Sequence, residues 1–486
     1  MSRRKHRPFR HASRRPPASG RKPSSKLPAH TVEASAEALL AFHRRFEACF
    51  RRREQRQWSL FYLCGQLSHL ERKTIEAMVL NLRRADANAG RDLERFLSEG
   101  QWDQPGMIEQ QQVIAAEGLG ESDGVIIADG SGFPKQGEQS VGVAYQYCGH
   151  LGKVANCQQG VFLVYASSSG HTFLDAQLYL PEEWFTHSYQ ARWQACRIPA
   201  GQPFRTEPQI ALDMITQLAQ RAVVPFRWVT ADETYGKSPI FLEGIEQLDK
   251  WFLVEVPTDT RVWLHTPAIE PPGQGLLGRP RTQPRVARTA AAPREVRDLA
   301  AGLPKSKWTR RMIKEGSKGP LVAEFAFLRA TTLRDKLPGR RVWVIFRRTL
   351  GPTRELKVYF SNAPTTCPRS EFIRVSGMRW PVETGLEDGK SEVGMDHYET
   401  RTWPAWHRHM AHTALAHLFL VGLCLQWQKK SGLDRAPGPP VDRPGHRRGR
   451  PTLTRRARHR ALSATPQSRR LSFASQAYPA TASAVL

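Results

Sequence analysis

The chain has 486 residues, of which 40% are hydrophobic, and its formal net charge is +27. This composition excludes a largely disordered chain and predicts roughly two to four folded domains with a polyanionic partner. No run of eighteen apolar residues occurs and no apolar segment follows the basic N-terminus, so we expect neither a membrane span nor a signal peptide. The seven cysteines include no CxxC pair, which argues against a disulfide framework or a structural zinc site and favours the reducing cytoplasm.

The positive charge is concentrated in three stretches. Residues 1–30 hold ten Lys and Arg and no acid, residues 429–486 hold thirteen against two acids, and residues 279–350 hold nineteen against five. We predict that residues 1–33 and 429–486 are disordered basic tails that attract phosphate without reading base sequence. Ribosomal binding or solubility could explain such tails, but neither readily explains a basic module inside the chain.

From Ala36 onward the apolar residues recur at helical spacing, which predicts a helical domain over residues 36–120. Helices are expected at 58–70 and 74–82, and another begins at Leu93. The many arginines make a DNA-binding domain our prediction, and a scaffold bundle is an equally supported alternative.

Short apolar runs then predict an α/β domain over residues 121–256. The predicted strands are 124–129, 160–166, 172–180, 226–232 and 251–256, and helices are predicted at 210–223 and 238–248. Three strands followed by alternating helices and strands is the order of a ribonuclease H-like fold. In that order the first and fourth strands are neighbours, so the carboxylates of Asp129 and Asp232 at their ends can converge.

Residues 257–370 interrupt this fold with a basic, β-rich insertion. It begins with a Pro-, Gly- and Arg-rich loop over 267–302, and it continues with strand patterns at 321–328, 341–346 and 355–361. The α/β domain resumes over residues 371–428 with its C-terminal helices. There, residues 403–425 predict a long buried helix rather than a membrane span.

The last helix of the α/β fold starts near Trp380, because a first helical turn tolerates Pro381. Spacings of four and seven residues bring Arg379, Glu383, Glu387 and Lys390 to one side of it. The simple alternative is a solvated face with ion pairs four residues apart. The two upstream aspartates favour a metal site instead, because three carboxylates suit Mg²⁺. Two such ions about 4 Å apart would activate an attacking oxygen and stabilise the leaving oxygen of a phosphodiester.

Several long motifs point to a family. The segments are Asp129–Lys135, Ser140–Gly149, Gly152–Gln158, Val229–Gly236 and Arg379–Lys390. They resemble the DDE transposases of bacterial insertion sequences, specifically the insertion sequence 701 group, and the likeness runs from about Ala36 to Gln426.

The resemblance implies a catalytic, metal-binding triad of Asp129, Asp232 and Glu383, with two Mg²⁺ ions as cofactor and Mn²⁺ able to substitute. Arg379, Glu383 and Lys390 also match the Tyr-(2)-Arg-(3)-Glu-(6)-Lys signature of the wider group. Ser376 stands at the tyrosine position of that signature.

The implied function is metal-dependent cleavage at insertion-sequence ends and transfer of the freed 3′-OH into target DNA. Partners would be double-stranded DNA, as terminal inverted repeats and target, and a second copy of the chain, in the bacterial cytoplasm on the nucleoid. We expect DNA phosphate to be bound by Arg379, Lys390, Tyr235, Arg310 and Arg311. For Tyr235 the alternative is a side chain that packs inside the fold without touching DNA. The rival functions are a DNA-binding protein that has lost catalysis and a ribonuclease H-like nuclease that cuts without joining.

Overall fold

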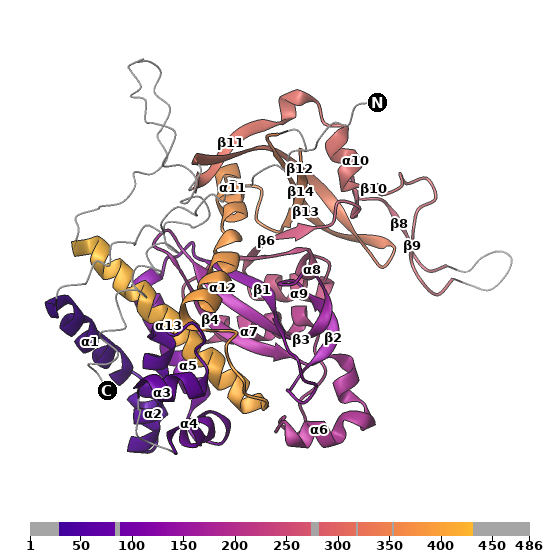
Figure 1. The fold of residues 1–486 in the computed structure, drawn as a ribbon. Coiled ribbons are helices and arrows are strands. Elements are labelled where there is room, and N and C mark those ends of the chain that lie inside the picture. Colours follow the sequence, from indigo (N-terminus) through magenta and orange to yellow (C-terminus); the bar gives the residue numbers. More distant parts are fainter. Residues whose placement is uncertain (1–28, 83–87, 274–280, 317–318, 352–353, 431–486) are drawn as a thin grey trace, which may run out of the picture.

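The structure is a computed structural model that describes residues 29–82, 88–273, 281–316, 319–351 and 354–430 (Figure 1). The predicted basic tails, residues 1–33 and 429–486, lie almost entirely outside these residues and stay a prediction. The described residues form an α/β fold around one large mixed sheet.

The centre of this sheet has the order β4-β3-β1-β5-β6. These strands are β1 (Val125–Pro134), β3 (Lys153–Ala166), β4 (His171–Tyr179), β5 (Trp228–Ala231) and β6 (Trp251–Val256). β3 runs antiparallel to β1 and β4, whereas β1, β5 and β6 run parallel to one another. Parallel strands with both faces covered are continuously apolar, and accordingly every residue of β5 is buried. A further strand, β2 (Ala144–Cys148), pairs with the first part of β3 and was not predicted.

Side chains of β1 alternate between two hydrophobic cores on opposite faces of the sheet. Ile126 and Ala128 belong to one core, and Val125 and Ile127 belong to the other, as the two-residue period of a strand requires. The first core also holds the inner face of α7 (Glu207–Arg221), and the second holds Val382 of α12 (Trp380–Val393). The sheet therefore separates these two helices.

The strands of the insertion extend the central sheet. They are β7 (Arg261–Trp263), β10 (Arg294–Glu295), β11 (Thr309–Gly316), β12 (Gly319–Arg334), β13 (Leu337–Thr349) and β14 (Leu356–Ser361). β14 pairs antiparallel with β6, from Val358 opposite Val256 to Ser361 opposite Leu253. Figure 1 shows these strands above the core. The pairing satisfies main-chain groups of β6 that an edge strand would leave open.

The predicted loop at 267–302 contains short regular elements among its described residues. β8 (Ile269–Glu270) and β9 (Arg285–Val286) form a separate two-stranded sheet, and α10 (Val296–Ala301) follows β10. Outside the insertion, the other α-helices that follow β1 are α6 (Gln190–Ala195), α8 (Glu233–Gly236), α9 (Pro239–Gln247), α11 (Arg369–Gly377) and α13 (Trp403–Lys430).

The N-terminal helices form a group in which α2, α4 and α5 pack against α13 and α3 packs against α2 and α4 (Figure 1). They are α1 (Ala29–Arg44), α2 (Arg53–Leu67), α3 (Ile75–Leu82), α4 (Ala89–Ser98) and α5 (Gln104–Leu119). Buried hydrogen bonds join α2 to α13: Tyr62 Oη lies 2.7 Å from His409 Nδ1, and Gln66 Nε2 donates to Thr413 Oγ1 at 2.8 Å. These contacts favour the scaffold alternative for this face of the helices, while DNA binding by their exposed faces stays a prediction.

Helix α13 contains a segment, Trp403–Gln426, that is long and apolar enough to cross a membrane. However, 83% of its most apolar window is buried inside the fold, among α2, α4, α5 and β4. It is the core helix that the sequence predicted.

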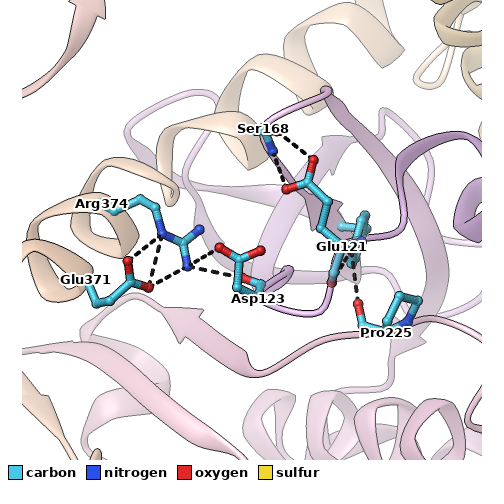
Figure 2. Close-up of polar contacts among 7 residues, drawn as sticks. Glu121, Asp123, Ser168, Pro225, Glu371 and Arg374 are labelled. Atoms are coloured by element: carbon cyan, nitrogen blue, oxygen red, sulfur yellow. Dashed lines mark hydrogen bonds and ion pairs between the residues drawn. The ribbon is translucent and has the colours of Figure 1, made fainter. Parts of the chain in front are cut away.

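A polar network holds α11 against the start of β1 (Figure 2). Arg374 of α11 lies 3.3 Å from an Asp123 carboxylate oxygen, donates to the Asp123 carbonyl at 3.1 Å and pairs with Glu371 at 2.9 Å. Nearby, Glu121 accepts from the Ser168 amide at 3.1 Å and from its hydroxyl at 2.6 Å, which ties the β3–β4 turn to the same edge. Because α11 leads directly into α12, this network helps to position α12.

Candidate active site

Three acidic residues lie side by side at the carboxyl ends of the parallel strands. Ala128 and Ala231 form the last registered pair between β1 and β5, and Asp129 and Asp232 follow them directly. In the same way, the register of β5 with β6 puts Glu255 next in the row. Neighbouring strands are about 4.8 Å apart, so the three side chains start from adjacent positions.

Asp129 does not end its strand, contrary to the predicted turn. β1 continues to Pro134, but beyond Ala128 it pairs with β3 alone. The parallel partner β5 stops at Ala231, which opens the sheet on that side of Asp129. The side chain of Asp129 is 17% exposed and its Oδ1 accepts from the Gly130 amide at 2.8 Å.

Helix α12 brings Glu383 and Arg379 to this row of acids. Arg379 forms an ion pair with Glu383 one turn along the helix. Its guanidinium also lies 3.7 Å from Asp129 Oδ2 and 3.9 Å from Glu255 Oε2. One partly buried cation is therefore shared by carboxylates from β1, β6 and α12.

The charges of the acids act on one another. Burial and the charge of Asp232 raise the pKa of Asp129 to about 7, with a further contribution from Glu383, although Arg379 and the Gly130 amide oppose the shift. Burial alone would lower the pKa of Arg379, but Glu383, Asp129 and Glu255 raise it overall. The cluster thus holds more negative charge than Arg379 neutralises, which is a setting in which a divalent cation binds.

Asp232 is held by the backbone that follows it. It is the N-cap of α8, and its Oδ1 accepts from the Thr234 amide at 2.8 Å. This hydrogen bond satisfies one open amide of the helix start and fixes the side-chain direction. The other carboxylate oxygen also lies within 3.4 Å of the Thr234 hydroxyl.

A family model of the DDE superfamily endonucleases matches residues 45–320. The chain belongs to the DDE superfamily of endonucleases. It is 26% identical over 344 residues to the probable transposase for insertion sequence element IS701 of Microchaete diplosiphon, covering 70% of this chain and 76% of that protein. The predicted resemblance to DDE transposases of the insertion sequence 701 group is confirmed. The superfamily acts on DNA with divalent metal ions.

Two solved structures show weaker likenesses. A piggyBac transposase synaptic complex with hairpin DNA matches with a TM-score of 0.37 and 9% identity, over 80% of this chain and 69% of that one. The NurA nuclease from Sulfolobus solfataricus matches with a TM-score of 0.25 and 11% identity, over 67% and 92%. Likenesses this low do not establish a shared fold.

In the transposase, Lys390 lies apart from the acid cluster. Its Nζ is 3.4 Å from the Gly132 carbonyl oxygen and 5.2 Å from the centre of the Phe133 ring. α12 thus follows β1, with Arg379 beside Asp129 and Lys390 beside Gly132. Glu387 lies one turn beyond Glu383 on α12 and is exposed, and no ion pair joins it to the acid cluster among the described residues.

Tyr235 corrects another expectation. Its side chain is 1% exposed and its ring centre lies 5.4 Å from that of Phe241. Among the described residues, its hydroxyl has no hydrogen-bond partner. A residue so deeply buried cannot contact DNA phosphate, so the packing alternative is the right one.

Arg310 and Arg311 are exposed on β11 and do not join the acids. Arg310 lies opposite Glu324 of β12 in the register, and Arg311 opposite Ala323. The same strand nevertheless approaches the site through Lys314, whose Nζ lies 5.2 Å from the centre of the Trp380 ring. Burial lowers the pKa of Lys314 while the charge of Glu383 opposes that shift. Lys314 was not predicted.

Two further acids of the site were also missed. Glu255 interrupts the apolar run of β6, which is a signal that the sequence does contain. Glu207 begins α7, and its Oε2 would lie 2.8 Å from a Cβ placed on Gly130. Burial and the charge of Asp232 raise the pKa of Glu207 to about 7. Only the three-dimensional packing of α7 beside β1 reveals that residue.

Proposed function

We propose that this transposase cleaves DNA at the ends of its mobile element with water and joins the freed 3′-OH to target DNA. Asp129, Asp232 and Glu383 are the proposed metal-binding carboxylates. The observation that carries the proposal is that Arg379 pairs with both Asp129 and Glu383, while Asp232 stands beside Asp129 on the neighbouring strand.

The chemistry of the donors fits Mg²⁺, with Mn²⁺ as a substitute. Carboxylate oxygens are hard ligands, and Mg²⁺ is bound by a few carboxylates together with substrate phosphate and water. The raised pKa of Asp129 supports the fit, because a divalent cation would balance the charge that Arg379 leaves uncompensated. When bound, two ions supply activation of the attacking oxygen and stabilisation of the leaving oxygen.

The residues of the chain have separate tasks in this proposal. When no metal is bound, Arg379 lies between Asp129 and Glu383 and orients both carboxylates. When a metal binds these carboxylates, the planar guanidinium of Arg379 is suited to bind a phosphate instead. The Thr234 amide holds Asp232 in position. Lys390 extends the positive charge along β1, and Lys314, Arg310 and Arg311 extend it along β11.

We also assign the catalytic domain to the ribonuclease H-like fold. The strand order β4-β3-β1-β5-β6, with β1, β5 and β6 parallel, supports the assignment. Terminal inverted repeats and target DNA are the proposed substrates, and a homodimer on the nucleoid is the proposed assembly. The continuous pairing of β6 with β14 suggests that residues 257–370 fold together with the catalytic domain.

A strand-transfer assay with labelled element ends tests the proposal. Full-length protein is incubated with end DNA, target DNA and Mg²⁺, and products are resolved as cut or joined. We expect both cut and joined products. Cut ends without joining would identify a nuclease, and bound but intact DNA would identify a DNA-binding protein without catalysis.

A further inference from the structure

A second group of metal-ligating side chains lies in the core. It consists of His171 at the start of β4, Asp388 of α12 and His417 of α13. One ligand atom from each residue lies within 4.8 Å of the others. The three side chains are buried, with exposures of 6%, 5% and 1%.

Two of these side chains direct unpaired polar atoms into the core. His417 Nδ1 lies 3.3 Å from the Thr172 hydroxyl, while its Nε2 has no hydrogen-bond partner among the described residues. Asp388 Oδ2 likewise has none there. Buried polar atoms are almost always paired. With Nδ1–H donated to Thr172, His417 presents the lone pair of Nε2, and this arrangement is typical of a metal-binding imidazole.

The charge of Asp388 is also uncompensated. No ion pair to it is present in the part of the chain that the structure describes, and burial with the charges of Glu392 and Glu387 raises its pKa to about 7. A buried lone carboxylate is costly, and a coordinated cation removes that cost. Burial holds His417 in its neutral form, which is the form that binds metal.

We propose that His171, Asp388 and His417 bind one Zn²⁺ ion that locks α12 onto β4 and α13. Two imidazoles and a carboxylate suit Zn²⁺, whereas Mg²⁺ prefers oxygen ligands alone. The ion would be distinct in chemistry from the metal of the acid cluster. The cysteine spacing predicted no structural zinc site, and these three ligands form no local motif.

The surroundings indicate a structural role. The Phe173 ring centre lies 5.1 Å from that of His417, and a Cβ on Gly385 would lie 3.6 Å from His171 Cδ2. α12 therefore rests directly on the proposed site. Since α12 also carries Glu383 and Arg379, a metal here would set their position relative to β1.

Metal analysis of untagged, full-length protein tests this inference. The wild type is loaded with Zn²⁺, desalted in excess Mg²⁺ to clear the acid cluster, and assayed for zinc. We expect about one zinc per chain, and its loss in Asp388→Asn and in His417→Gln. His412→Gln is the matched control, because His412 is equally buried on α13 but both its nitrogens are hydrogen-bonded, to Ser59 and to the Arg408 carbonyl; it should keep the zinc.

Co²⁺ loading of the wild type gives a second readout that does not depend on variants of the three proposed ligands. Imidazole-ligated Co²⁺ in the core should give a visible spectrum that survives excess Mg²⁺ and the substitution Asp232→Asn. A wild type that retains neither zinc nor a Co²⁺ spectrum would overturn the proposal. Zinc retained equally by Asp388→Asn and His417→Gln would overturn it as well.

Discussion

Asp129 and Asp232 stand at the same level of two neighbouring parallel strands, each one residue beyond the last registered pair. The register of β1 with β5 brings these two residues together. The local sequence and the helix-capping role of Asp232 would not do so alone. Arg379 from α12 then closes the group by pairing with Asp129 and Glu383. The following predictions test what this arrangement does.

Asp129→Asn should stabilise the metal-free protein at high pH. The folded-state pKa of Asp129 is about 7, above that of an unfolded chain, so the charged form is disfavoured in the fold. The penalty is absent at low pH, grows as pH rises toward 7 and is complete above it. In EDTA near pH 8 the variant should gain roughly 1–3 kcal/mol, and the gain should shrink toward about pH 5.

Thermal unfolding with and without Mg²⁺ checks this prediction. Bound metal should raise the Tm of the wild type more than that of Asp129→Asn, because ligand binding to the folded state stabilises it. Equal stabilisation of both proteins by Mg²⁺ would place the metal elsewhere.

Two substitutions of Arg379 separate its charge from its shape. Arg379→Gln leaves carboxylates of β1, β6 and α12 without their shared cation, so the metal-free protein should lose roughly 1–3 kcal/mol, less than for a fully buried pair because Arg379 is partly exposed. Arg379→Lys keeps the charge and should lose less stability. Both should cleave poorly, since neither offers the bidentate guanidinium. Denaturant titration and the cleavage assay give the two readouts, and full activity of Arg379→Lys would contradict the phosphate role.

Gly130→Ala tests the packing around the site. The new methyl group would lie 2.8 Å from Glu207 Oε2 and 2.8 Å from Gln159 Nε2, so these side chains must move. We expect a loss of roughly 1–3 kcal/mol together with reduced cleavage. Gly137→Ala is the matched control, because nothing lies within 4 Å of its added methyl group. Unchanged activity of Gly130→Ala would show that Glu207 and Gln159 do not matter for the site.

The terminal segments and strand β11 should contribute differently to DNA affinity. Removing residues 1–28 and 431–486, which leaves α1 intact, should weaken non-specific binding and reduce its salt dependence, because fewer phosphates are neutralised. Arg310→Glu combined with Arg311→Glu should instead impair binding to element ends, since both residues are exposed on ordered β11.

Titrations of cognate and random duplexes at several salt concentrations measure both effects. Loss of cognate preference on tail removal, with preference kept in the β11 variant, would contradict this division.

Much of the α/β core could be predicted from the sequence, because its strands are apolar runs that end near acidic residues. β5 and β6 are examples, and the position of Asp232 at a strand end followed directly. The pairing of β14 with β6 could not be predicted, since it joins segments about a hundred residues apart without a local signal. β2 was missed because its side chains are partly exposed, with Tyr145 and Tyr147 largely in solvent.

The candidate site shows the same division. Its triad and Arg379 follow from spacing and motif, whereas the burial of Tyr235 depends on the direction in which a four-residue helix presents its side chains. Glu207 and Lys314 come from elements whose approach to the acids is set only by tertiary packing. The proposed ligands could therefore be named from the sequence, whereas the residues that surround them could not.

The most direct test of the central claim is the labelled-end strand-transfer assay applied to Asp129→Asn, Asp232→Asn and Glu383→Gln. Each change removes one carboxylate charge and nearly preserves shape, so DNA binding should survive. Cleavage and joining should each fall by roughly 10³-fold or more, as expected for the loss of several kcal/mol of metal-based stabilisation. Glu387→Gln, on the exposed face of the same helix, should act like the wild type. Wild-type turnover by any one of the three triad variants would contradict the assignment.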